Sequence, residues 1–157
     1  MNQTPADDQA ETAAVLLRIA QAVARRTGDA GYARALALDV YRAAAPPGGE
    51  SEPGLGTLLS MALQAAGRSI RDIDRTLARE ASDAGAIASL RPSDRETLRL
   101  VYWDRLSMAE LAECLGCSIA QAGRRLDRAY RRAERRLRAL ADTPDAPVPA
   151  RIRVTNA

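Results

Sequence analysis

The stretch that decides the fold is residues 92–140, PSDRETLRLVYWDRLSMAELAECLGCSIAQAGRRLDRAYRRAERRLRAL. It reads as three helices separated by two short breaks. The last helix, residues 118–140, holds eight arginines and two acids, whereas residues 1–117 hold 13 arginines and 16 acids. One cationic helix on a mildly acidic body favours a polyanion as ligand, and the phosphate backbone of nucleic acid is the first candidate.

Capping residues indicate where these three helices begin and end. Ser93 and Ser107 are each followed by a glutamate three residues later, which is the spacing of a capping box. Ser118 is predicted to cap the third helix, and Gly116 suits the left-handed residue that ends the second. A short helix, a glycine turn and a helix with a polar amino end together follow the plan of a helix-turn-helix.

Apolar residues recur at helical spacing in all three segments, which predicts a buried face on each. The expected inner positions of the first two helices are Leu98, Val101, Tyr102, Leu111, Ala112 and Leu115. The third helix is expected to bury one continuous stripe made of Ile119, Ala122, Leu126, Ala129, Ala133, Leu137 and Leu140.

Helical periodicity also runs through the amino-terminal half, over residues 11–26, 30–44 and 57–79, with Gly28 and the Pro-Pro-Gly-Gly run at 46–49 as breaks. No period-two alternation typical of strands occurs. We therefore expect an all-α fold of two small helical domains joined by a linker. The expected boundaries are a disordered leader at 1–10, a helical domain at 11–79, a linker at 80–91, a helix-turn-helix domain at 92–141 and a disordered tail at 142–157.

Composition argues against several other classes of protein. The chain has no histidine, which removes the commonest general base and metal ligand. Cys114 and Cys117 form a CxxC, but zinc needs four ligands, so we expect them to pack at the helix turn. Asp72 and Asp74 lie beside arginines and are expected on a solvated helix surface. No apolar run approaches the ~20 residues of a membrane span, and the start is unlike a signal peptide.

These observations predict a cytoplasmic protein with no catalytic residues, no cofactor, no metal site and no small-molecule substrate.

Residues 90–140 resemble region 4 of sigma-70 family RNA polymerase sigma factors, particularly the extracytoplasmic-function (ECF) branch. The matching residues are Leu90, Pro92, Arg95, Glu96, Leu98, Tyr102, Leu106, Ser107, Glu110, Leu111, Ala112, Leu115, Gly116, Ser118, Arg125, Leu126, Arg128 and Ala129.

The resemblance to region 4 implies that the third helix reads a −35-like promoter element in the major groove. Gly123 departs from the family, which commonly has a basic residue there. The DNA-binding residues that the resemblance implies are Ser107, Ser118, Ala120, Gln121, Arg124, Arg125 and Arg128.

Residues 11–79 resemble region 2 of the same family more faintly, through LLRIAQAVARRTGDAGYARALALDVYRAA and GTLLSMALQAAGRSIRDIDR. This resemblance implies binding to the RNA polymerase core, with Asp39 and Tyr41 as candidate contacts. Ala35 and Leu38 stand where the family has an acidic residue and a glutamine. The chain also has no Phe and one Trp, so it offers little surface on which flipped bases could stack.

Three functions follow from these patterns and stay open at this point. The first is an ECF-type sigma factor, whose partners would be promoter DNA, the polymerase core and an anti-sigma factor. The second is a sigma-factor mimic that binds an anti-sigma factor, polymerase or DNA without melting promoters. The third is a free-standing helix-turn-helix regulator, dimeric through residues 11–79. An enzyme is the residual class, and we expect no membrane partner.

Overall fold

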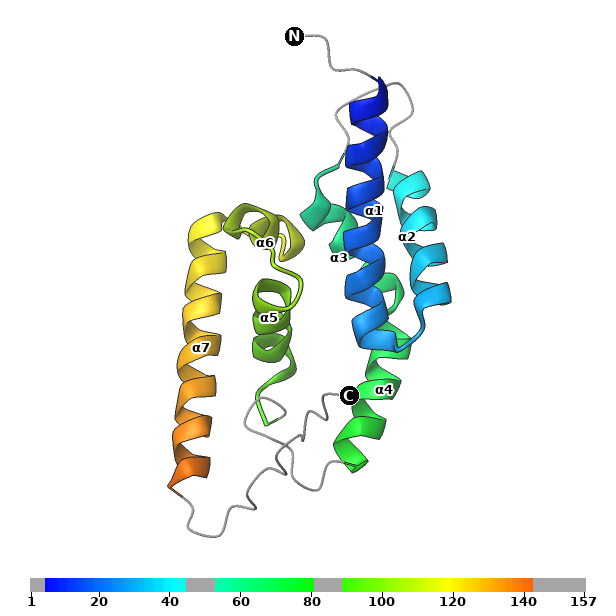
Figure 1. Ribbon diagram of the computed structural model, residues 1–157. Helices are drawn as coiled ribbons and strands as arrows, with labels where there is room; N and C mark the ends of the chain where they lie inside the picture. The colour runs from blue at the N-terminus through cyan, green and yellow to red at the C-terminus, as the bar shows by residue number, and fades with distance from the viewer. Residues whose placement is uncertain (1–4, 45–52, 81–88, 143–157) are drawn as a thin grey trace, which may run out of the picture.

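The computed structural model describes residues 5–44, 53–80 and 89–142, and the described residues form α-helices without strands (Figure 1). The expected all-α fold is therefore confirmed. The helices are α1 (Pro5–Thr27), α2 (Ala30–Ala44), α3 (Leu55–Ala65), α4 (Gly67–Glu80), α5 (Pro92–Tyr102), α6 (Met108–Cys114) and α7 (Ile119–Ala141). Within the described part of the chain, no helix has the length and apolar character needed to cross a membrane.

Helices α1 and α2 form an antiparallel hairpin whose turn is set by the local sequence. Gly28 has φ +70° and donates its backbone N–H to the Ala24 carbonyl over 2.8 Å, which ends α1. Asp29 then caps α2, because its Oδ1 accepts the Tyr32 backbone N–H over 2.9 Å. The prediction of a helix over residues 30–44 is confirmed.

Two predictions for the amino-terminal half were wrong. The chain is helical from Pro5, so the leader expected over 1–10 is not disordered from that residue onward. The single helix expected over 57–79 is two helices, α3 and α4, which are separated at Ala66. Ala66 is buried and is followed by Gly67, whose low helix propensity makes a break there inexpensive. Most of the predicted linker and tail, residues 81–88 and 143–157, lies outside the described residues.

The prediction that Ser93 caps α5 was also wrong. The N-cap residue is Arg91, and Pro92 occupies the first helical position. Proline favours that position because its φ is already helical and no N–H is needed there. Ser93 thus lies inside the helix, where its carbonyl accepts the Thr97 hydroxyl over 2.8 Å. Glu96, expected to complete a capping box, instead contacts arginines.

Helix α7 packs against α5 through a small apolar cluster made of Leu90, Leu98, Leu126, Ala129 and Ala133. Three residues of the expected buried faces are exposed: Tyr102, Ile119 and Leu137. Leu137 is exposed because the carboxyl-terminal part of α7 continues beyond the amino end of α5, as Figure 1 shows. The side chain of Leu140 lies outside the described residues.

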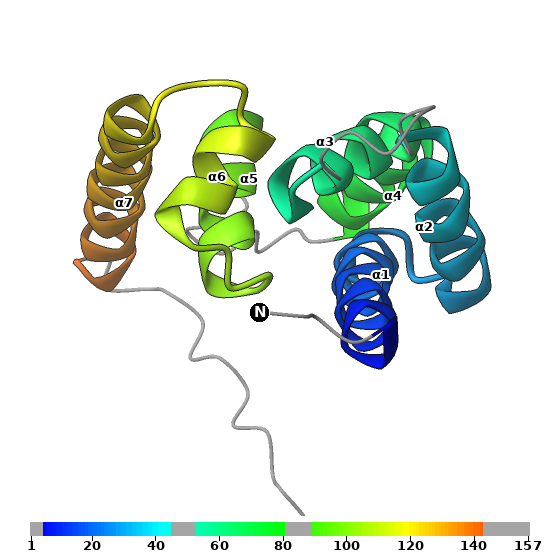
Figure 2. The same cartoon turned by 90° about the horizontal axis from the view of Figure 1, so that it is seen from above.

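The two groups of helices, α1–α4 and α5–α7, lie in direct contact. Helix α3 packs against α6, and α7 lies on the outer side of the carboxyl-terminal group, far from α2 (Figure 2). One apolar core runs through both groups. Its buried members include Ile19, Val23, Ala37, Leu58, Leu59 and Ala62 from the first group and Leu100, Leu106, Leu111, Ala112 and Ala122 from the second.

Candidate nucleic-acid interface

Helix α6 begins with the capping box that the sequence predicts. The Ser107 Oγ accepts the backbone N–H of Glu110 over 3.2 Å, and a Glu110 carboxylate oxygen accepts the Ser107 backbone N–H over 2.7 Å. Burial alone would raise the pKa of the Glu110 carboxyl, but these hydrogen bonds and the ion pair with Arg18 lower it. The start of α6 is therefore fixed by its own sequence and by a contact from α1.

The turn between α6 and α7 is a Schellman motif. Gly116 has φ +60° and donates its N–H to the Glu113 carbonyl over 3.1 Å, while the Cys117 N–H reaches the Ala112 carbonyl over 3.0 Å. Glycine has no Cβ and adopts this left-handed backbone conformation at little cost in free energy. The predicted role of Gly116 is therefore confirmed.

A second reciprocal cap begins α7. The Ser118 Oγ accepts the Gln121 backbone N–H over 3.3 Å, and the Gln121 Oε1 accepts the Ser118 backbone N–H over 3.0 Å. This is the glutamine form of a capping box, of which only the serine was expected from the sequence. The cap occupies the carbonyl oxygen of Gln121, so its amide NH2 is the group that can donate to a ligand.

Six of the residues predicted to bind DNA lie at or after the amino end of α7, and Ser107 lies at the start of α6. All seven are exposed: Ser107, Ser118, Ala120, Gln121, Arg124, Arg125 and Arg128. Among the described residues, none of the three arginines forms an ion pair. Their guanidinium groups are therefore open to solvent, without a carboxylate that a phosphate would have to displace.

The charge on the rest of α7 is only partly neutralised. Arg132 pairs with Asp94 of α5 over 2.7 Å, and Arg138 pairs with Glu134 one turn earlier. The Arg138–Glu134 pair lies toward the carboxyl end of the helix, away from the residues predicted to bind DNA. Arg131, Arg135 and Arg136 have no ion pair within the described ranges. A cationic helix face with this many unpaired guanidinium groups suits a phosphate backbone.

An ion-pair network, absent from the sequence analysis, joins the two groups of helices. Asp104, in the segment between α5 and α6, accepts hydrogen bonds from Arg25 and Arg26 of α1 over 2.6 Å each. Arg26 also pairs with Glu96 of α5. The side chains of Arg26 and Asp104 are 1% and 2% exposed. Burial alone would lower the pKa of Arg26, but Asp104 and Glu96 together raise it above its usual value.

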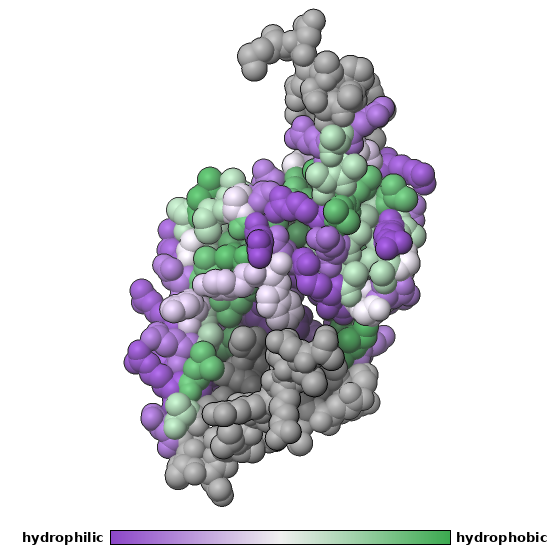
Figure 3. Space-filling model, viewed as in Figure 1, coloured by the Kyte–Doolittle hydropathy of each residue, from purple (hydrophilic) through white to green (hydrophobic). Residues whose placement is uncertain are grey.

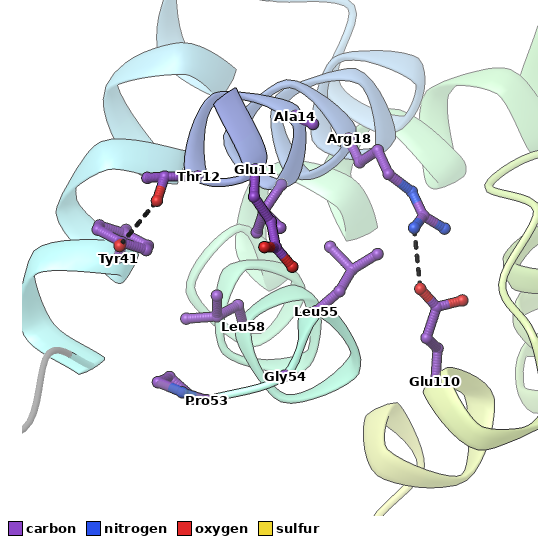
Figure 4. Close-up of a pocket in the computed structure, with 11 residues that line it drawn as sticks. Glu11, Thr12, Ala14, Arg18, Tyr41, Pro53, Gly54, Leu55, Leu58 and Glu110 are labelled. Atoms are coloured by element: carbon purple, nitrogen blue, oxygen red, sulfur yellow. Dashed lines mark hydrogen bonds and ion pairs between the residues drawn. The ribbon is translucent and has the colours of Figure 1, made fainter. Parts of the chain in front are cut away.

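Two further contacts strengthen this junction. Arg18 of α1 pairs with Glu110 of α6 over 2.8 Å, as Figure 4 shows. Gly56 of α3 lies so close to α6 that a Cβ at that position would overlap the carbonyl oxygen of Glu110. The partners are separated by some 50 to 90 sequence positions, and no spacing rule could have paired them. Gly56 lies just before the helix expected over 57–79, so the sequence alone did not mark it as a point of close approach between helices.

The two residues predicted to bind the polymerase differ in their surroundings. Asp39 is exposed on α2, with Arg42 4.0 Å away. Tyr41 is half-buried, and its hydroxyl lies 3.4 Å from the Thr12 hydroxyl. Tyr41 lines a hollow of about 640 Å³ between α1, α2, α3 and α6, into which Glu11 also points (Figure 4).

The two cysteines pack against the core at the end of α6, as predicted from the sequence, and neither forms a disulfide. Burial raises the pKa of the Cys114 thiol to about 11, so the thiolate form is disfavoured. Asp72 is exposed and pairs with Arg75, as expected. Asp74 is less solvated than expected, because it lies 3.5 Å from Arg99 and links α4 to α5.

Comparison with known proteins agrees with this geometry. Residues 84–132 match the family model of sigma-70, region 4, and these residues contain α5, α6 and the first half of α7. The carboxyl-terminal group of helices is therefore a sigma-70 region 4 domain, which is a DNA-binding domain of transcription factors rather than an enzyme family. The match spans less than half of the chain. A search among curated proteins found no match.

Proposed function

We propose that the protein is a transcription initiation factor of the ECF sigma type, which recruits the RNA polymerase core and reads a −35-like promoter element. The observation that carries this proposal is the set of exposed, unpaired arginines at the amino end of a helix within a region 4 domain. Such a factor would act in the cytoplasm, where the chromosome and the polymerase meet.

The proposed DNA contacts divide into two kinds. Ser118 caps α7, and Ala120, Gln121 and Arg124 lie in its first turns, the part of a recognition helix that reaches base edges in the major groove. Ser107, Arg125 and Arg128 would contact the backbone. Arginine can bind guanine with two parallel hydrogen bonds, so Arg124 is the residue that would contribute most to sequence preference.

The polymerase contact is proposed to lie on the amino-terminal group. Asp39 is the stronger candidate of the two predicted residues, because its carboxylate is exposed and has only a distant cation beside it. Tyr41 would contribute through the edge of its ring, since it is half-buried against α1. An anti-sigma factor is a further proposed partner.

Transcription in vitro with purified core polymerase tests this function. We expect the full chain to direct specific initiation on a promoter that contains its selected binding sequence, and Arg124→Ala to abolish that specificity. Arg34→Ala, an exposed arginine of α2, is the matched control. Failure of the full chain to bind core polymerase or to start transcription on any selected sequence would overturn the sigma-factor proposal.

A second candidate is a helix-turn-helix regulator or sigma mimic that binds DNA without melting promoters. It is favoured by the shared core and the buried Arg26–Asp104 pair, which hold the two groups of helices together while leaving the DNA-reading end exposed. Binding of the selected duplex with full affinity in the absence of polymerase, together with no initiation in its presence, would favour this candidate.

A further inference from the structure

Trp103, the only tryptophan of the chain, lies at the surface between the two groups of helices. Trp103 is 51% exposed, although burial of its large apolar ring would stabilise so small a protein. The guanidinium of Arg99 lies over the ring, 5.4 Å from its centroid. The indole is therefore held in place by a cation while much of it remains open to solvent.

Trp103 lines a hollow of about 690 Å³ that both groups of helices help to form. Arg18, Gln21 and Arg25 come from α1, and Asp104 and Arg105 come from the segment that follows α5. On the face shown in Figure 3, strongly hydrophilic side chains gather along this junction. A volume of this size falls within the range of ordinary ligand sites.

The hollow has hydrogen-bond donors available for an anion. Arg105 is exposed, and no carboxylate within the described ranges pairs with it. Arg18 and Arg25 each pair with one carboxylate, which leaves part of each five-donor guanidinium for another acceptor. Asp104 is buried and already accepts hydrogen bonds from Arg25 and Arg26, so its charge is compensated.

Arg105 also has an unusual backbone. Its φ of +54° places it in the left-handed region, which non-glycine residues seldom adopt. The Arg18 guanidinium donates to the Arg105 carbonyl over 3.4 Å and so supports this conformation. Strained residues of this kind cluster at binding sites, where they aim a side chain.

We propose that this hollow binds a nucleotide of single-stranded DNA, with the base stacked on Trp103 and its phosphate held by Arg105 and the α1 arginines. An exposed aromatic ring beside a cationic groove is the arrangement that single-strand binding uses. Ser107, which is proposed to contact DNA, follows Arg105 by two residues, so an unpaired base next to a bound duplex would lie near the hollow. The site stands whether or not the chain works with polymerase.

Fluorescence of the full chain tests the proposal directly, because all tryptophan emission comes from Trp103. The probes are a single-stranded oligonucleotide of about ten residues, a duplex of the same length, a deoxynucleoside monophosphate and inorganic phosphate. We expect the single strand to quench the emission at the lowest concentration. Equal quenching by single strand and duplex, or no quenching, would overturn the proposal. Tighter binding of the monophosphate than of the strand would instead assign the hollow to free nucleotides.

Two variants and a control separate stacking from general charge attraction. Trp103→Ala, followed by fluorescence anisotropy of a labelled strand, should weaken single-strand binding roughly 5- to 150-fold, the usual range for one stacked base. Arg105→Ala should weaken it while leaving duplex affinity unchanged, and Arg34→Ala should change neither. Circular dichroism confirms that each variant is folded. Wild-type single-strand affinity in both Trp103→Ala and Arg105→Ala would refute the assignment.

Discussion

The buried ion pair at the junction gives the sharpest prediction about stability. Asp104→Ala removes the carboxylate that pairs with both Arg25 and Arg26. The Arg26 side chain is only 1% exposed, so its charge would be left buried without this partner. Breaking a buried pair by removing one partner costs about 3–5 kcal/mol, because the remaining charge is left without compensation. Glu96 stays beside Arg26 and compensates part of its charge. We therefore expect the lower end, about 3 kcal/mol.

Urea unfolding followed by circular dichroism at 222 nm measures this loss. With an m value of about 1.5 kcal/mol/M, a loss of about 3 kcal/mol moves the unfolding midpoint down by about 2 M. The matched control is Asp72→Ala, which breaks a pair whose side chains are 66% and 71% exposed. Exposed pairs contribute about 0–1 kcal/mol, so its midpoint should barely move.

A compensating variant tests whether the loss comes from the unpaired charge. Replacing both partners, Arg26→Met with Asp104→Leu, should recover most of the stability, because apolar side chains of similar size often replace a buried pair without loss. If Asp104→Ala costs less than 1 kcal/mol, the pair is not buried in solution and the two groups of helices are not held as described.

Three further predictions concern single positions. Gly56→Ala places a Cβ against the Glu110 carbonyl oxygen and should destabilise the chain by about 1–3 kcal/mol, whereas Gly67→Ala, where the nearest atom is the flexible end of Arg71, should not. Gly123→Ala meets no close neighbour and should stabilise α7 by up to about 1 kcal/mol in thermal unfolding; a loss would mean that close packing excludes a side chain there. Because the folded-state pKa of Glu110 is lowered from 4.5, its charge stabilises the protein above that pH, and this contribution disappears as the pH falls through the folded-state value. The stability difference between wild type and Glu110→Gln should therefore be largest above about pH 5 and vanish at lower pH, and a pH-independent difference would contradict this reasoning.

Local signals in the sequence were sufficient for the helix-turn-helix. Ser107, Gly116 and Ser118 each act on neighbours within five positions, so their caps and turn could be predicted without knowing what lies around them. The same holds for the turn at Gly28. At Ser93 two local signals competed, and the fixed φ of Pro92 decided where the helix begins.

Contacts between distant segments could not be predicted in this way. The periodicity that placed Leu137 on a buried face was correct for the helix, but no other described helix reaches that far along α7. Arg26 and Asp104 are charged residues whose burial depends on partners some 70 to 80 positions away, and their residue types predict both at the surface. Most of the candidate DNA-binding residues could be predicted from the sequence because they follow one another along α7, whereas the Trp103 hollow forms only where α1 meets the segment after α5.

The amino end of α7 is proposed to read the bases of a duplex. Its most direct test is the affinity of wild type and Arg124→Ala for a duplex selected by the full chain from a random library, against an unrelated duplex. We expect Arg124→Ala to lose about 1–3 kcal/mol on the selected duplex and little on the unrelated one. Arg138→Ala, at the other end of α7, should lose little on either. An equal loss on both duplexes, or none with Arg124→Ala, would contradict base reading by this helix.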